Sequence, residues 1–190
     1  MLPVQALDYP HDFYTSQKEL YRRIKVDPGQ TSFHDGREFR TFHEFSIATG
    51  TSQWFEINVG VDTILYDFQL NVDANGLRMR TFRDGTPLGT YSTALPVIPK
   101  NSMSIRSTPI YVSQNSILYG GTGVTGGTLV DLTRTIAAGA TAQQSTVSAN
   151  GFGQRGVAAG TYYWQLENIT NGTATGTLNL FWAEILNLGV

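Results

Sequence analysis

The chain has 190 residues, a formal net charge of −2 and no cysteine, and 15% of its residues are charged. This length suits one domain with a substantial core, and the balanced charge argues against a protein that binds nucleic acid through bulk charge. The lack of cysteine excludes disulfides and the usual zinc sites, and it fits folding in a reducing cytoplasm.

Targeting and membrane signals are missing from the sequence. The N-terminal residues show no basic start followed by an apolar segment, so we expect no signal peptide. No run approaches 18 apolar residues, so we expect no membrane span. Without secretion, the two sequons that begin at Asn168 and Asn171 are expected to stay unglycosylated.

Residues 1–36 are predicted to form an N-terminal arm that is separate from the main domain. Pro3 and Pro10 interrupt its start, and Ser16 with Glu19 forms a capping box that opens a helix over about residues 16–26. Alone in water, so short a helix is marginally stable, and we expect it to dock on a surface. Its candidate assembly contacts are Phe13, Tyr14, Leu20, Tyr21, Arg22 and Arg23.

From Glu38 onward, apolar residues recur with a period of two, which predicts β-strands. About ten strands are expected, separated by polar, glycine-rich loops and with no helix between them. Residues 37–190 are therefore predicted to form an all-β domain, a jelly-roll-like antiparallel β-sandwich. The clearest strand covers residues 63–73, with these side chains expected on one face: Ile64, Tyr66, Phe68, Leu70 and Val72.

Asn75-Gly76 predicts a two-residue type I′ turn, in which both central residues need a positive φ. We therefore predict that residues 63–73 pair with residues 77–83 as a β-hairpin. Apolar residues would then face apolar ones, and acidic or amide residues would face arginines. The predicted register joins Ala74 with Leu77, Val72 with Met79, Leu70 with Thr81, Asp73 with Arg78 and Asn71 with Arg80.

Residues that could support catalysis or metal binding are few and poorly arranged. His34 and His43 each precede an acidic residue, but adjacent residues of a strand point to opposite faces. Glu167 and Glu184 could form a carboxylate pair only by facing each other across a cleft, and we interpret them as a rim residue and a strand-end residue. The loop 119–127 lacks the Gly-Lys-Ser/Thr ending of a phosphate-binding loop. We predict no catalytic residue, no metal site and no cofactor, and we expect that the protein is not an enzyme.

The three tryptophans, Trp54, Trp164 and Trp182, allow two interpretations. Exposed, they would form a platform on which a sugar ring could stack. Trp164 and Trp182 alternate with leucines on one face of their strands, a pattern more typical of a core.

Charge is unevenly distributed along the chain. Residues 107–190 contain 13 of the 20 glycines and only five charged residues: Asp131, Arg134, Arg155, Glu167 and Glu184. A free monomer normally depends on surface charge for solubility. A surface rich in Thr, Gly and Asn instead suits a chain that is covered by copies of itself or by a larger assembly.

Five segments carry a resemblance to known proteins: LPVIPKN (95–101), TPIYVSQ (108–114), GGTGVTGGT (120–128), Gln143-Gln144-Ser145 and, most specifically, GQRGVAAGTYYWQLENITNGTATGTLNLFWAE (153–184). They resemble a family of tailed-bacteriophage virion structural proteins. The similarity covers roughly residues 37–186 and leaves out the first 36. It implies a jelly-roll-like domain that trimerises on the virion, as capsid decoration (cement) proteins do, and it implies no catalytic positions.

The resemblance also implies the partners and the location. The partners would be other copies of this chain in a homotrimer and the phage major capsid protein, with no nucleic acid and no membrane. The location would be the capsid surface of the virion, after assembly in the host cytoplasm. The alternative is a tail or head-fibre module that recognises a host surface glycan through exposed aromatic residues.

Overall fold

The computed structural model describes residues 32–33, 35–100, 111–136, 145–148 and 155–185, all within the unit Ser32–Val190. The predicted helix 16–26 and most of the predicted arm lie outside these residues. Within the described residues, no helix is long and apolar enough to cross a bilayer.

The described part of the chain is built almost entirely from β-strands, as the period of two predicts. In chain order the strands are β1 (Glu38–Ile47), β2 (Ser52–Val59), β3 (Thr63–Ala74), β4 (Gly76–Arg83), β5 (Thr86–Leu88), β6 (Thr93–Ala94), β7 (Ile98–Pro99), β8 (Ser116–Tyr119), β9 (Gly123–Thr125), β10 (Thr128–Ile136), β11 (Ser145–Ser148), β12 (Arg155–Val157), β13 (Gly160–Asn168) and β14 (Ala174–Glu184).

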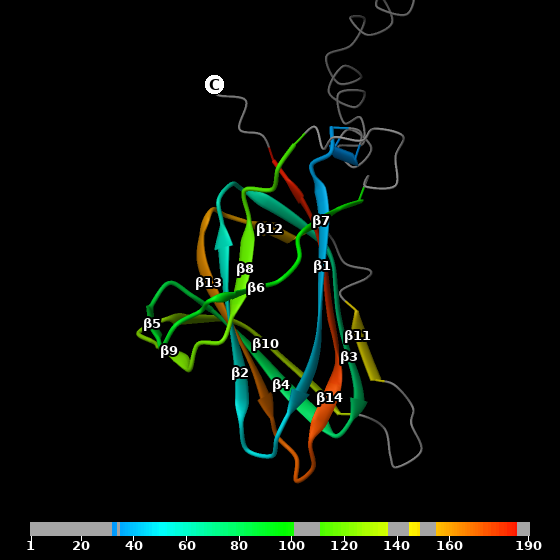
Figure 1. Cartoon of the computed structure of the whole chain (residues 1–190), viewed down its shortest axis with the longest axis vertical. Coiled ribbons are helices and arrows are strands. Elements are labelled where there is room, and N and C mark those ends of the chain that lie inside the picture. Colours follow the sequence, from blue (N-terminus) through cyan, green and yellow to red (C-terminus); the bar gives the residue numbers. More distant parts are fainter. Residues whose placement is uncertain (1–31, 34, 101–110, 137–144, 149–154, 186–190) are drawn as a thin grey trace, which may run out of the picture. The chain divides into compact units, whose positions relative to one another are not determined.

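Two antiparallel sheets face each other (Figure 1). The first sheet has the order β11-β3-β14-β1-β7, with β12 also paired to β3, and the second has the order β10-β4-β13-β2-β8-β6. A short ribbon of β5 and β9 stands apart from both. The main strands of the two sheets therefore form a β-sandwich.

The strand order is that of a jelly roll. The chain alternates between the sheets from β1 to β4, stays in the second sheet at β10, and alternates again through β11, β13 and β14. This path places β1-β14-β3-β11 opposite β2-β13-β4-β10, which is the arrangement of the two four-stranded sheets of a jelly roll. The predicted jelly-roll-like antiparallel β-sandwich is confirmed.

The predicted hairpin between residues 63–73 and 77–83 is wrong. β3 pairs with β14 in the first sheet, whereas β4 pairs with β13 and β10 in the second. Asn75 does have a positive φ of 65°, but Gly76 does not have a positive φ and already belongs to β4. The predicted type I′ turn is therefore wrong as well, and the bend at Asn75 carries the chain from one sheet to the other. Leu70 of β3 and Leu77 of β4 are both buried in the core, one from each sheet. The alternation of apolar and polar residues therefore places apolar side chains in the core equally well without a hairpin.

The partners of the two strands differ accordingly from the predicted register. Val72 lies opposite Gly176, and Met79 lies opposite Leu166. Arg78 lies opposite Glu167 instead of Asp73.

A β-bulge in β3 also changes which side chains face the core. Phe181 and Trp182 are adjacent in β14 but lie opposite Asp67 and Leu65, so Tyr66 is an extra residue. The bulge reverses the alternation, and Leu65 packs against the core in place of its neighbours. The prediction that one face holds five alternate residues of this strand is therefore right only for its C-terminal part.

The core lies between the sheets and contains two of the three tryptophans. Trp182 is 2% exposed and stacks on Phe39 at 5.8 Å, while Trp164 is 7% exposed. Each large apolar side chain buried in this way contributes about 1.5–3 kcal/mol to stability. The interpretation of Trp164 and Trp182 as core residues is confirmed.

The turn between β13 and β14 is pinned by Asn168, the first residue of one sequon. Its side-chain amide donates to the carbonyls of Ile47 (2.8 Å) and Gly172 (2.7 Å), and its Oδ1 accepts from both the backbone and the hydroxyl of Thr170 (2.9 and 2.8 Å). Asn168 is 3% exposed, so this amide is closed to a glycosyltransferase. Asn171 of the other sequon is exposed.

The glycine-rich segment 119–127 connects β8 to β10 and contains β9. The ring of Tyr91 covers Gly121 so closely that a Cβ there would lie 2.1 Å from the ring. The Tyr91 hydroxyl also donates to the carbonyl of Gly123 at 2.8 Å. These glycines therefore allow close packing in a segment that connects two strands.

Candidate functional site

The six predicted contacts of the arm, Phe13, Tyr14, Leu20, Tyr21, Arg22 and Arg23, lie outside the described residues. A candidate surface within the β-domain must therefore come from the described strands.

Strand β10 presents an unusual apolar edge. Among the described strands it pairs only with β4, so it is the last strand of the second sheet. Four of its apolar side chains are about half exposed: Leu129 (50%), Val130 (50%), Leu132 (54%) and Ile136 (51%). We call these four residues the β10 edge. Monomeric proteins usually protect edge strands with charge or proline, so an apolar edge is typical of a contact with another chain.

A group of arginines lies beside the β10 edge on the outer face of the second sheet. Arg78 makes a bidentate pair with Glu167 (3.0 and 2.7 Å), and Arg80 contacts the same carboxylate at 2.6 Å. Arg134 of β10 lies directly opposite Arg78. Two guanidinium groups thus share one carboxylate and a third arginine lies next to them in the sheet, so this face suits an acidic partner surface.

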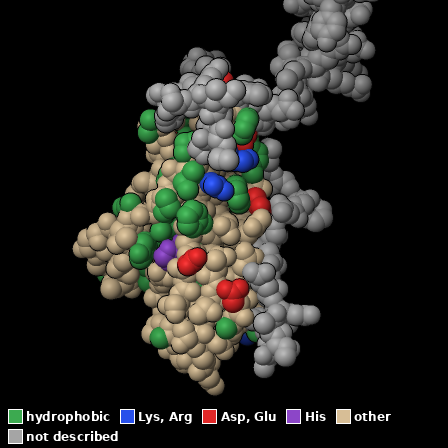
Figure 2. Space-filling view, turned by 45° about the vertical axis from the view of Figure 1, so that its right-hand side comes forward, with side chains coloured by type: hydrophobic (Ala, Val, Ile, Leu, Met, Phe, Trp, Pro, Cys, Tyr) green, Lys and Arg blue, Asp and Glu red, His purple; other side chains and the backbone are tan. Residues whose placement is uncertain are grey.

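The remainder of the surface is poor in charge, as the composition predicts for the C-terminal half. Figure 2 shows one face of the molecule, where only a few acidic or basic side chains interrupt a largely uncharged surface. On the outer face of the first sheet, neutral side chains make contacts such as Asn71 Nδ2 to Thr177 Oγ1 at 3.2 Å, and Gln69 donates to the carboxylate of Asp67 at 2.7 Å.

Glu167 and Glu184 do not form a carboxylate pair. Glu167 lies one residue before the end of β13, and Glu184 lies at the far end of β14 in the other sheet. At about 3.3 Å per residue, the length of β14 separates them by roughly 30 Å. Glu184 is the predicted strand-end residue, but it is fully buried and accepts hydrogen bonds from Ser113, the Gln114 backbone and Trp182.

His43 of β1 contacts side chains of β2 and β8 in the second sheet. Its ring lies 5.2 Å from Phe55 and 4.9 Å from Tyr119, and its Nε2 is 3.0 Å from Gln53 Nε2. The hydrogen-bond partner of the imidazole is thus a side chain. Within the described residues, no group of three or more His, Cys, Asp or Glu side chains could hold a metal ion.

We expect the stability of the domain to fall as the pH falls through the titration range of His43. Burial lowers the pKa of His43 below 6.5 and outweighs Gln53 and Glu44, which raise it. Because the unfolded chain then binds the proton more readily, the free energy of unfolding should decrease from about pH 7.5 to about pH 5.5. Urea denaturation across this range should show a smaller decrease for His43→Gln. An unchanged pH dependence in this variant would contradict the prediction.

Trp54 is the one tryptophan of the three with enough exposed surface to stack on a sugar ring. It is half-buried on the outer face of the second sheet and stacks on Phe82 with ring centroids 5.9 Å apart. With Trp164 and Trp182 inside the core, the three tryptophans do not form one platform.

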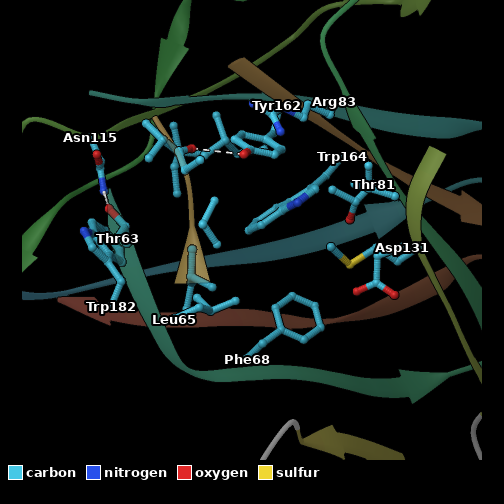
Figure 3. A pocket seen from close by; sticks show the side chains of 18 of the residues that line it. Thr63, Leu65, Phe68, Thr81, Arg83, Asn115, Asp131, Tyr162, Trp164 and Trp182 are labelled. Atoms are coloured by element: carbon cyan, nitrogen blue, oxygen red, sulfur yellow. Dashed lines mark hydrogen bonds between the residues drawn. The ribbon is translucent and has the colours of Figure 1, made fainter. Parts of the chain in front are cut away.

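A cavity of about 560 Å³ lies between the two sheets (Figure 3). Leu65, Phe68 and Trp182 line it from the first sheet, and Met79 and Trp164 from the second. Sequence reasoning did not find this cavity, because alternation shows which side chains point inward but not how closely they fill the interior. The β10 edge was also missed, although two adjacent apolar residues in TLVDLTRTI already break strict alternation.

Comparison with models of known protein families finds no match, and no curated protein matches the sequence at a significant level. The resemblance to virion structural proteins is therefore an expectation from the sequence alone.

Proposed function

We propose that this chain is a non-enzymatic virion structural protein, a capsid decoration protein that binds the outside of a phage head as a homotrimer and stabilises the shell. The observation that carries the proposal is the strand order, with β1-β14-β3-β11 facing β2-β13-β4-β10. Jelly rolls of this kind are frequent among viral capsid domains, and they also occur in lectins and cupins. The segments that resemble virion proteins fall largely within this fold.

The β10 edge supports assembly with other copies. A closed ring of three subunits gives each subunit one donor surface and one acceptor surface, so every β10 edge can be covered by a neighbour. The adjacent Arg78, Arg80 and Arg134 give the same region a positive potential. An acidic surface on a neighbouring subunit or on the major capsid protein would complement it.

The alternative, a tail or head-fibre module that binds a host glycan, has less support. Trp164 and Trp182 are 7% and 2% exposed, so neither can stack on a sugar. Among the three tryptophans, only Trp54, which stacks on Phe82, offers aromatic surface on an outer face.

Cryo-electron microscopy of the intact particle tests the proposal directly. A decoration protein is expected in hundreds of copies on the shell, whereas a handful of copies on the tail would contradict it. Deleting residues 1–26 tests separately whether the arm contributes to capsid binding. If the shortened protein bound particles as well as the full-length protein, the arm would have no role in that binding.

Leu132→Lys is expected to weaken the homotrimer. Leu132 is 54% exposed on β10, and burying a leucine contributes about 2 kcal/mol, so each subunit contact should weaken about thirtyfold. Light scattering coupled to size-exclusion chromatography would then show monomers at concentrations at which the unmodified protein is trimeric.

Phe42→Lys is the matched control, because Phe42 is also an exposed apolar residue (47%) but belongs to β1 of the first sheet. This variant should stay trimeric. If both variants dissociated to the same extent, or if both stayed trimeric, the β10 edge would have no specific role in the trimer.

A further inference from the structure

The cavity between the sheets is large and apolar. Its volume of about 560 Å³ falls within the usual range for small-molecule sites, about 300–1,000 Å³. The cavity opens to solvent, so water that enters it meets mainly apolar walls, and an apolar ligand would remove those walls from water. A cavity of this kind therefore favours an apolar occupant.

The walls of the cavity are rigid parts of the core. Phe68 and Trp164 meet edge to face with ring centroids 6.0 Å apart, and Leu180 and Trp182 continue the wall along β14. These four residues come from both sheets, and Leu180, Trp164 and Trp182 are at most 7% exposed. The lining is thus fixed by the strands themselves, and its chemistry suits aliphatic or aromatic carbon.

The mouth of the cavity lies where the two sheets part. Val130 and Leu132 line one side and are about half exposed, and Gly156 and Ala158 line the other side and are exposed. Residues of the β10 edge therefore contribute an apolar rim at this opening.

The polar groups of the lining lie in two places: Thr63 and Asn115 are buried and hydrogen-bonded to each other at 2.8 Å, whereas Arg83, Thr81 and Asp131 lie together on the side of β4 and β10. The Arg83 side chain is 46% exposed, lies 5.8 Å from the centre of the Tyr162 ring, and is only loosely paired with Asp84 (3.8 Å). Asp131 and Thr81 face the cavity from neighbouring positions of β10 and β4 (Figure 3). A ligand with an apolar body and one polar end would match this arrangement.

We propose that the interior of the sandwich binds an apolar chain with a single polar end, of the medium-chain fatty acid class, with the chain between the sheets and the polar end beside Arg83. This inference stands on the cavity alone and does not depend on the virion function.

Titration of the full-length protein with straight-chain carboxylates and the matching alcohols tests the proposal. Trp164 and Trp182 line the cavity, so intrinsic fluorescence reports its occupation. Affinity should rise about fourfold with each added methylene and level off once the cavity is full. No saturable change with any chain length would overturn the proposal.

Two substitutions of threonine by phenylalanine separate the cavity from the surface. Thr81→Phe fills the cavity and should lower the affinity at least about tenfold. Thr177→Phe makes the same chemical change on the outer face of β14 and should leave the affinity unchanged. Equal effects of the two variants would exclude the cavity as the site.

A third variant tests the polar end of the ligand. Arg83→Gln should weaken the binding of decanoate but not of 1-decanol. If the variant and the unmodified protein bound decanoate with equal affinity, Arg83 would not contact the polar end of the ligand. If Thr81→Phe does not fold, nuclear Overhauser contacts between decanoate and the Trp164 ring in the unmodified protein decide the matter. Their absence at saturation would overturn the proposal.

Discussion

Replacing Glu184 by alanine is expected to lower the free energy of unfolding by about 3 kcal/mol. Glu184 is 0% exposed at the end of β14, where its carboxylate accepts from Ser113 Oγ, from the backbone N–H of Gln114 (3.0 Å) and from Trp182 Nε1 (3.3 Å). Alanine leaves these three donors without their acceptor. Each unpaired buried donor costs about 1–3 kcal/mol, and part of that cost is recovered if water enters.

The buried carboxylate also organises the segment before β8. Burial raises the pKa of Tyr111 to about 12, and the hydrogen bond to Glu184 acts in the same direction. Glu184 thereby holds Tyr111, Ser113 and Gln114 against β14, although they are about 70 residues away in the sequence. Loss of the carboxylate should therefore loosen this segment as well as the strand end.

Urea denaturation would measure the change, with an unaltered slope showing that the unfolded state is the same. Glu184→Gln keeps the shape and one acceptor oxygen and should cost less than Glu184→Ala. Glu44→Ala, on the exposed face of β1, should change stability by no more than about 0.5 kcal/mol. A loss below about 1 kcal/mol for Glu184→Ala would show that the buried hydrogen bonds are not needed.

Gly176→Ala is expected to be at least as damaging, at about 3 kcal/mol or more, because the position has no room for a side chain. A Cβ at Gly176 would lie 2.0 Å from the backbone oxygen of Asn71 and 2.7 Å from Cζ of Phe45. The oxygen belongs to the neighbouring strand β3, so it can move only if the central pair of the first sheet separates. This pair holds the bulge at Thr175 and Gly176, where β14 begins.

Thermal and urea unfolding of Gly176→Ala and Gly156→Ala provide the comparison. Gly156 lies in β12, and a Cβ there would meet nothing within 4 Å, so this variant should be tolerated. Similar stabilities for the two variants would mean that the first sheet can relax around the added methyl group.

Much of the fold could be predicted from the sequence because alternation reports which side of a strand is buried. The pattern in residues 38–47 and 160–184 correctly indicated strands, and the leucines beside Trp164 and Trp182 correctly indicated the core. The absence of a helix pattern after residue 37 and the number of strands were enough to predict an antiparallel jelly-roll-like sandwich.

The candidate site was harder to predict, because it depends on which strands become edges. Leu132 and Ile136 have the pattern of ordinary strand residues, and only the sheet order shows that β10 is an edge with half-exposed apolar residues. The cavity likewise depends on the distance between two sheets, which no local pattern encodes.

The sequence by itself determined that this chain forms strands, where most of them lie, and which side chains face inward. Only the tertiary structure decided the partner of each strand. The sequence at Asn75 allows a sharp bend in either case, and the inward residues Leu70 and Leu77 are buried equally well by a hairpin or by opposite walls of a sandwich. The choice between them was made by β13 and β14, because Glu167 opposite Arg78 and Gly176 opposite Val72 place the two strands in different sheets.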